Sequence, residues 1–223
     1  MSKIRKLYLY LMALPKTIYF NFKYLKFNQA LKLPIFVSHR VWLMETGGQV
    51  TISQPIKTAM VRIGFGEVGI FDRHRSRTIW QVNGQVIFNG NANIGHGSKI
   101  SVAEAGKLTL GDKFTITAES SIVCFKEIQF GCECLLSWDT LIMDTDFHKI
   151  KDSNGNIINE PCPILIGDHV WIGCRCLILK GSMIPDNCIV GANSTVSKSI
   201  MGTNQIIAGN PCTVLKENVE WEM

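Results

Sequence analysis

The sequence has no long hydrophobic run. Within its 223 residues, no apolar stretch reaches the ~18 residues that a membrane-spanning helix needs. The longest run, Leu7 to Leu14, is too short, and no small-residue cleavage site of a signal peptide follows it. We therefore expect neither a conventional transmembrane helix nor a secretory leader. Hydrophobic residues make up 46% and charged residues 18%, which excludes a disordered chain and predicts one domain with a substantial core.

Cysteine is absent from the first half of the chain, since all 8 cysteines lie at or after Cys124. The pairs Cys132/Cys134 and Cys174/Cys176 do not have the C-x₂-C spacing of zinc sites. Because residues i and i+2 of a strand share a face, these pairs predict packing, and no metal is expected. Without a secretory signal, we expect reduced thiols in a cytoplasmic protein.

A repeat of six residues is the main feature that is present. The aliphatic residues Ile166, Ile172, Ile178, Ile184, Val190 and Val196 follow one another in six-residue steps. This period fits no helix, which has 3.6 residues per turn. It fits short strands that are each broken by a turn after one inward-facing aliphatic side chain, so that successive coils bury one another. Further runs at the same step are Val82 to Ile100, Leu110 to Ile128 and, in a shifted phase, Phe130 to Ile142.

Three motifs resemble the hexapeptide-repeat acyltransferases, most closely their sugar and capsule O-acetyltransferase branch. They are Ile166-Gly167-Asp168-His169-Val170-Trp171-Ile172-Gly173, Val190-Gly191-Ala192-Asn193-Ser194-Thr195-Val196, and Ala208-Gly209-Asn210-Pro211-Cys212. The resemblance is dense from about residue 82 to residue 216. It implies an all-β solenoid, a left-handed parallel β-helix of triangular section, assembled as a homotrimer.

The first 44 residues are of a different kind, because no acidic residue precedes Glu45. A 3–4 spacing of apolar residues predicts an amphipathic helix that Pro15 kinks or splits. Two roles remain open: a helical cap over the end of the solenoid, or contact with the inner face of an anionic membrane, where each Lys or Arg adds ~1 kcal/mol. We divide the chain into residues 1–44, the solenoid at 45–198 with an excursion loop at 144–163, and a C-terminal turn and tail at 199–223.

The excursion loop interrupts the repeat and carries His148. Loops on a rigid scaffold often carry chemistry, and the resemblance implies that a histidine in such an excursion is catalytic. Imidazole titrates near neutrality, so His148 could take a proton from an acceptor hydroxyl and return it to a leaving thiolate. Asp146 could orient the imidazole, bind sugar hydroxyls or cap a turn. We predict a catalytic role for His148 and Asp146.

Acceptor contacts are predicted for the residues Asp144, Ser137, Trp138 and Asp139. The stretch Ser137-Trp138-Asp139 resembles the acceptor side of capsule-type relatives, and Trp138 could stack on a sugar ring or simply pack. The resemblance further implies that the donor, acetyl-CoA, lies in a groove between subunits. The residues that it assigns to acetyl-CoA are Trp171, Gly173, Cys174, Ala192, Ser197, Lys198, Asn210, Pro211 and Lys216.

The resemblance implies an acetyl-CoA-dependent O-acetyltransferase that acts on a sugar or lipid-linked saccharide, for a capsule or O-antigen precursor. N-acetylation of an amino sugar, acetylation of serine or a xenobiotic, a γ-type carbonic anhydrase and a non-catalytic solenoid stay open as alternatives. The anhydrase is disfavoured because no closely spaced histidine pair lies near His148. Nucleic acid is not expected as a partner, since the excess charge of +5 is concentrated at the N-terminus.

Overall fold

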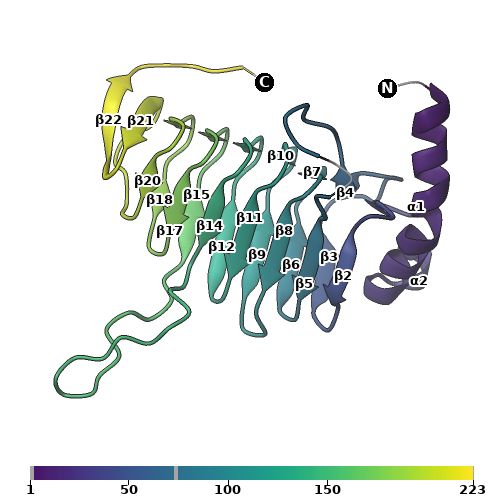
Figure 1. Ribbon diagram of the computed structural model, residues 1–223, viewed down its shortest axis with the longest axis horizontal. Coiled ribbons are helices and arrows are strands. Elements are labelled where there is room, and N and C mark those ends of the chain that lie inside the picture. Colours follow the sequence, from purple (N-terminus) through teal and green to yellow (C-terminus); the bar gives the residue numbers. More distant parts are fainter. Residues whose placement is uncertain (1–2, 73–74, 223) are drawn as a thin grey trace.

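The computed structural model describes residues 3–72 and 75–222, which form a solenoid with one long and one short helix at its N-terminal end (Figure 1). Three sheets make its sides. Sheet A contains β1 (Ile35–Val37), β4 (Val61–Phe65), β7 (Ala92–Gly95), β10 (Phe114–Ile116), β13 (Leu135–Leu136), β16 (Trp171–Ile172), β19 (Ile189–Val190), β21 (Gln205–Gly209) and β22 (Cys212–Glu217).

Sheets B and C complete the triangle. Sheet B contains β2 (Trp42–Glu45), β5 (Ile79–Val82), β8 (Lys99–Val102), β11 (Ser121–Cys124), β14 (Leu141–Met143), β17 (Leu177–Leu179) and β20 (Thr195–Val196). Sheet C contains β3 (Gln49–Ile52), β6 (Gln85–Phe88), β9 (Lys107–Leu110), β12 (Glu127–Phe130), β15 (Ile164–Ile166) and β18 (Met183–Ile184). The named strands pair in parallel, apart from the antiparallel hairpin β21–β22.

The six-residue repeat corresponds to one side of the triangle. Three steps make one coil, so Ile166 pairs with Ile184, Ile172 with Val190, and Ile178 with Val196 in sheets C, A and B. All six of these side chains are buried. The aliphatic positions predicted from the repeat therefore form one continuous core along the solenoid axis.

Glycine follows three of the six aliphatic residues, at positions 167, 173 and 191, and the structure shows a packing reason for it. A Cβ atom at Gly173 would lie 2.7 Å from the backbone nitrogen of Ala192 in the next coil, so close stacking of the corners requires glycine there. The left-handed backbone conformation falls two residues later, on Arg175 and Asn193, with φ of 59° and 58°. Gly173 therefore serves close packing of the coils rather than a left-handed backbone conformation.

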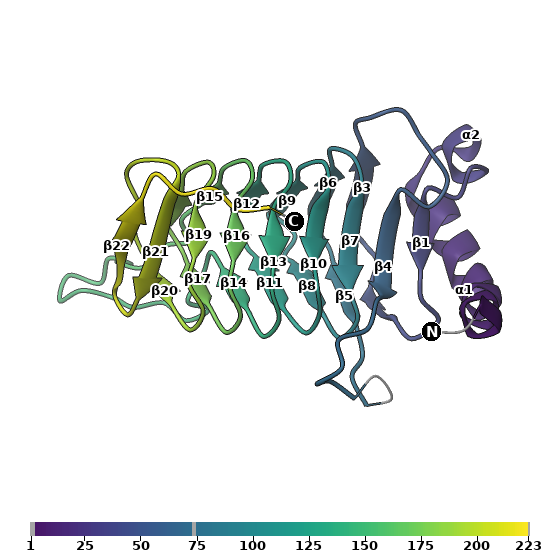
Figure 2. The same cartoon turned by 90° about the horizontal axis from the view of Figure 1, so that it is seen from above.

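Helix α1 (Lys3–Tyr24) lies across the N-terminal end of the solenoid, followed by the single turn α2 (Phe27–Ala30) (Figures 1 and 2). It runs unbroken through Pro15. Buried Asn21 on α1 accepts a hydrogen bond from the Ile35 amide (3.1 Å) and donates one to the Ile35 carbonyl (2.7 Å). Thr17 makes the same two kinds of bond with Val37. Side chains of α1 thus satisfy the backbone groups that strand β1 would otherwise leave unpaired at the sheet edge.

The sheets extend beyond the predicted solenoid boundaries of residues 45 and 198. Strands β1 and β2 pair with β4 and β5 before residue 45, and β21 continues sheet A after residue 198. No helix within residues 3–72 and 75–222 is long and apolar enough to cross a membrane.

Asn21→Ala should lower the free energy of unfolding by about 1–3 kcal/mol, because it leaves the buried amide and carbonyl of Ile35 without partners. Chemical denaturation measures the change. Asn154→Ala, at an exposed position in the excursion loop, is the matched control and should be neutral. Equal stability of the two variants would contradict the capping role of Asn21.

Candidate active site

The excursion loop leaves the solenoid after β14 and returns at β15, at the corner between sheets B and C. It projects away from the coils (Figure 1). An antiparallel bridge between Lys151 and Ile157 gives its outer part a hairpin form. His148 lies exposed near its base, and the Asn159 side chain donates to the His148 carbonyl at 2.7 Å. The returning half of the loop thus holds the backbone that carries the imidazole.

Asp146 anchors this loop to the solenoid. Its carboxylate accepts hydrogen bonds from Lys180 Nζ (2.6 Å) and Asn159 Nδ2 (2.9 Å), and Lys180 follows β17 in the next coil. These hydrogen bonds, with that from Lys180 the larger cause, hold the pKa of Asp146 below its ordinary value. In the described chain, Asp146 therefore stays ionised and bonds to Lys180 and Asn159 rather than to the imidazole of His148.

Asp144 has a structural position. It is fully buried, and its carboxylate accepts hydrogen bonds from the backbone amides of Phe125, Lys126 and Glu127 at 2.7–2.8 Å. With both oxygens engaged by the preceding coil, this carboxylate is not presented to a sugar. The sequence suggested an acceptor contact because Asp144 is near His148 in the chain, but the coil geometry turns the carboxylate inward.

A second group of predicted residues stacks at the corner between sheets A and B. The amide of Arg175 donates to the Trp138 carbonyl, and the amide of Asn193 donates to the Cys174 carbonyl, so successive coils place their corner residues one above another. The column formed by these corners contains Ser137, Trp138, Asp139, Gly173, Cys174 and Ala192. We call it the A–B column. Three residues predicted for acetyl-CoA and three predicted for the acceptor thereby meet along one corner of the solenoid.

Trp171 lies beside the A–B column on sheet A. Its indole Nε1 donates to Ser137 Oγ at 3.1 Å, and the side chain is 37% exposed. Exposed Ser197 and Lys198 lie at the other corner, between sheets B and C, in the coil that follows Lys180. Asn210 and Pro211 form the turn of the β21–β22 hairpin, and exposed Lys216 lies on β22.

Within one chain, His148 shares its corner with Ser197 and Lys198 but not with Trp171 or the A–B column. The loop with His148 is at the corner between sheets B and C, whereas Trp171 and the A–B column lie across sheet B from it. A full side of the triangle therefore lies between the predicted general base and the predicted acetyl-CoA groove.

An open cavity of about 570 Å³ lies beside the base of the excursion loop. Two aromatic rings, Phe125 and Phe147, meet edge to face at 5.1 Å at one side. The remaining wall carries amide, hydroxyl and carboxylate groups from earlier coils: Glu45, Gln81, Asn83 and Ser101. Apolar rings with a few polar groups are typical of a small-molecule site, and this cavity adjoins the residue that precedes His148.

The C-terminal tail returns along sheet A (Figure 2) and makes a contact that no sequence motif indicated. Trp221 stacks on His169 with ring centroids 4.2 Å apart and 11° between planes. Its Nε1 donates to the His169 carbonyl at 2.9 Å, and His169 Nε2 donates to the Trp221 carbonyl at 3.0 Å. Trp221 also lies 5.9 Å from the Trp171 ring. The tail thus bounds one side of the predicted acetyl-CoA groove.

Comparison with known proteins identifies the repeats. Residues 163–198 match the family model described as bacterial transferase hexapeptide (six repeats). The putative colanic acid biosynthesis acetyltransferase WcaF of Escherichia coli (strain K12) is 30% identical over 123 residues, which are 55% of this chain and 65% of that protein. The polysialic acid O-acetyltransferase of Neisseria meningitidis is 37% identical over 125 residues, 56% of each protein.

The solved structures agree with this result. The polysialic acid O-acetyltransferase OatWY matches with a TM-score of 0.54 and 26% identity, over 81% of this chain and 86% of that one. The predicted resemblance to the hexapeptide-repeat acyltransferases is confirmed, and so is the left-handed parallel β-helix. The chain spans less than two thirds of the length of the curated relatives named here, at 65% and 56%.

Lys180→Met should release the excursion loop without unfolding the solenoid, because the bonds from Lys180 to Asp146 and to the Asn159 carbonyl are lost at a partly exposed site. We expect faster hydrogen exchange at residues 146–160 and unchanged exchange in the core strands. Lys151→Met, on the outer part of the loop, is the control and should leave exchange at the loop base as in the wild type.

The same anchor has a defined pH dependence. Because the pKa of folded Asp146 lies below 3.8, the anchor is fully present above pH 3.8 and is lost as the pH falls through the lowered value. Loop exchange, corrected for its intrinsic pH dependence, should therefore not change between pH 7 and about pH 5. Loosening within that range would show that Asp146 is not the anchoring group.

Proposed function

We propose that this protein is an acetyl-CoA-dependent O-acetyltransferase that moves acetyl to a sugar hydroxyl, with His148 as general base. The observation that carries the proposal is an exposed imidazole on a loop that Asp146, Lys180 and Asn159 fasten to a hexapeptide-repeat solenoid. Support comes from relatives whose names describe acetyl transfer in polysaccharide biosynthesis. A precursor of a surface polysaccharide is the proposed acceptor.

The chemistry follows from the imidazole. Neutral His148 accepts the proton of the acceptor hydroxyl as its oxygen attacks the thioester carbonyl. The tetrahedral intermediate expels the thiolate of coenzyme A, and the imidazolium returns the proton to that sulfur. The sugar gains an ester, the thioester carbon–sulfur bond breaks, and His148 ends neutral. Asp146 acts as a positioning residue in this scheme, because its carboxylate fastens the loop rather than touching the ring.

The A–B column suits the pantetheine arm of acetyl-CoA, which is mostly uncharged. Buried Gly173 lets the corners of successive coils stack closely, and half-buried Cys174 and exposed Ala192 add small side chains. Trp171 would flank the arm. The hairpin turn at Asn210 and Pro211, with exposed Lys216 on β22, would meet the adenine and a phosphate group.

The proposed site is complete only between two copies of the chain. Sheet B separates His148 from the A–B column within one protomer, so the loop of one copy must reach the column of its neighbour. Such a contact is heterologous, because it joins two different surfaces of the chain. Copies joined in this way form a closed ring when the rotation between neighbours is a whole fraction of a full turn. For a triangular solenoid with parallel axes, we propose a homotrimer with a site at each subunit interface.

The cavity beside Phe125 and Phe147 is the proposed acceptor site. Sugar rings present apolar faces to aromatic side chains and hydroxyls to amides and carboxylates, and this cavity offers both kinds of partner. Phe147, the residue before His148, lines it, so an acceptor hydroxyl bound there would be close to the loop that carries the imidazole.

We further propose that α1 contacts a membrane surface. Its buried face carries Ala13, Phe20 and Asn21, yet its outer face is also apolar. At ~100° per residue the exposed apolar positions cover an arc of about 140°. They are Leu7, Tyr8, Leu11, Met12, Ile18, Tyr19 and Phe22. No acidic residue precedes Glu45, which suits an anionic surface. In a parallel trimer, three such helices would face the same plane.

His148→Ala should lower kcat by about 10²–10⁴ while the oligomer still forms, because the proton acceptor is lost. Release of free thiol from acetyl-CoA, followed with a panel of free, nucleotide-linked and lipid-linked saccharides, measures the rate and identifies the acceptor. Lys149→Ala on the same loop is the control and should retain activity. Turnover by His148→Ala equal to that of the wild type would remove the general-base assignment.

A mixing experiment tests whether the site is shared. His148→Ala lacks the base, and Cys174→Trp fills the A–B column, so each variant alone should be inactive. After unfolding and refolding an equal mixture, about a quarter of the interfaces should combine an intact loop with an intact column, and activity should return in that proportion. Absence of recovery, with mixed oligomers demonstrated by mass, would place the whole site within one chain.

Vesicle binding tests the membrane contact. Leu11→Ser combined with Phe22→Ser should weaken sedimentation with vesicles that contain phosphatidylglycerol, because two apolar side chains leave the outer face of α1. Met201→Ser with Leu215→Ser removes two exposed apolar residues at the opposite end of the solenoid and is the control. Equal binding by the two double variants would argue against α1 as the contact.

A further inference from the structure

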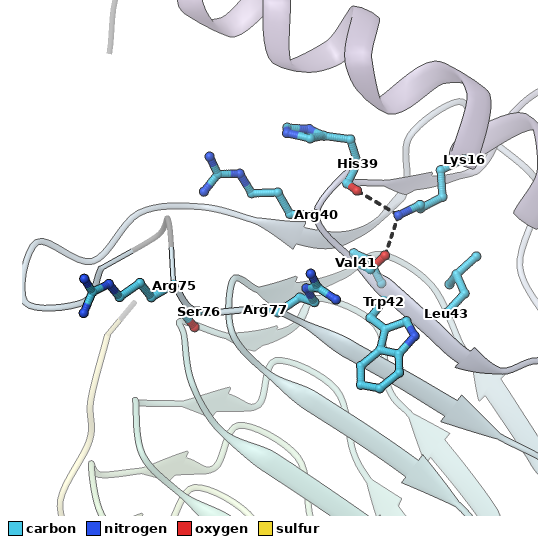
Figure 3. A pocket seen from close by; sticks show the side chains of 9 residues that line it. All are labelled: Lys16, His39, Arg40, Val41, Trp42, Leu43, Arg75, Ser76 and Arg77. Carbon is cyan, nitrogen blue, oxygen red and sulfur yellow. Dashed lines mark hydrogen bonds between the residues drawn. The ribbon is translucent and has the colours of Figure 1, made fainter.

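A cavity of about 680 Å³ lies between α1 and the first coils, far from the excursion loop (Figures 1 and 3). Three separate chain segments form its wall: α1, the connection from β1 to β2, and the stretch that leads into β5. Its lining residues are Lys16, His39, Arg40, Val41, Trp42, Leu43, Arg75, Ser76 and Arg77. Among the described residues, the lining contains four lysine or arginine side chains. Its Ser76 hydroxyl donates to the Glu119 carboxylate, which also pairs with Lys99.

Arg75 and Arg77 have different surroundings in this cavity. Arg75 Nε lies 3.8 Å from a carboxylate oxygen of Asp72, outside the lining. Arg77 lies over the Trp42 ring with its guanidinium carbon 5.9 Å from the centroid, an arrangement that orients the group without cancelling its charge. Figure 3 shows Arg40 and Arg77 on the side of Lys16, whereas the almost fully exposed Arg75 side chain lies at the outer end of the cavity and points away from them.

Lys16 forms the inner wall. Its ammonium group donates to the carbonyl oxygens of His39 (2.7 Å) and Val41, which fix its position without supplying a negative charge. Burial, and secondly the positive charge of Arg77, lower the pKa of Lys16. The two cations therefore repel one another across the cavity, and an anion between them would relieve that repulsion.

The chemistry of the lining selects the kind of ligand. A lining rich in guanidinium groups disfavours cations, and guanidinium forks match the oxygens of phosphate in bidentate hydrogen bonds. The volume of the cavity lies within the ~300–1,000 Å³ of small-molecule sites. It is larger than the volume that a simple inorganic anion occupies. Trp42 and Leu43 add an apolar wall for the group that carries the phosphate.

We propose that this cavity binds an exposed phosphate or diphosphate group. It lies at the flank of α1, where Lys16 is the only charged residue between Leu7 and Phe22, so the outer apolar face of the helix and the cation-lined opening adjoin. This arrangement suits a phosphate carried by a membrane lipid, such as a lipid-linked saccharide. The site deepens the proposed membrane contact, and it is independent of the proposed acetyl transfer.

Binding of the full-length protein to two probes tests the site. Inorganic pyrophosphate, measured by calorimetry, is the soluble probe; phosphatidylcholine vesicles that contain either phosphatidic acid or phosphatidylglycerol are the lipid probes. Phosphatidic acid exposes a phosphate monoester, whereas phosphatidylglycerol carries a diester of similar charge. Arg75→Gln combined with Arg77→Gln is the test variant, and Lys126→Gln combined with Lys151→Gln, at exposed positions elsewhere, is the control of equal charge change.

We expect the wild type and the control to bind pyrophosphate, and the test variant to bind it at least about tenfold more weakly. The wild type should prefer phosphatidic acid over phosphatidylglycerol, and the test variant should lose this preference. Pyrophosphate binding without a lipid preference would keep the phosphate site and make the ligand a soluble one. Failure to bind either phosphate monoester or pyrophosphate, or equal losses in test and control variants, would overturn the site. Binding to phosphatidylglycerol vesicles measures the contact of α1 with an anionic membrane, separately from the phosphate site.

Discussion

Coil-on-coil stacking of aliphatic side chains is the interaction on which the rest of this molecule depends. Ile172 lies on Val190 and Ile178 on Val196 in exact parallel register, and the core runs without interruption from Ile35 to Ile207. Because each coil repeats the backbone path of the one before, residues at equivalent corners form columns. The A–B column, the glycines that allow close stacking and the anchored base of the excursion loop all follow from this geometry.

The same stacking separates in space residues that lie close together in the sequence and have different roles. Asp144 and Asp146 are two residues apart, yet one caps the preceding coil from the core side and the other binds Lys180 on the surface. His148 and the A–B column are kept apart by a full side of the triangle. A rigid solenoid has no hinge that could close this gap, which is the physical argument for a site shared between copies.

The two ends of the solenoid are treated differently. At the N-terminal end, Thr17 and Asn21 occupy the hydrogen-bonding positions that another strand would take next to β1, so the exposed edge is closed by a helix. At the C-terminal end, an antiparallel hairpin ends sheet A, and its tail turns back until Trp221 stacks on His169. At the N-terminal end, the outer apolar face of α1 and the cation-lined cavity stay exposed. At the C-terminal end, the tail forms a wall beside Trp171.

The sequence by itself determined the solenoid, its core and the position of its interruption. A period of six in β-branched residues such as Ile166 and Ile172 is compatible with few structures, and local spacing is enough to detect it. Only the tertiary structure decided the partners of the polar residues. The bond from Lys180 to Asp146 and the stacking of Trp221 on His169 join residues 34 and 52 positions apart. The cavity of Lys16, Arg40 and Arg77 joins three segments. Such contacts depend on where each coil returns after a full turn. The identity of a polar residue does not tell how far along the chain its partner lies.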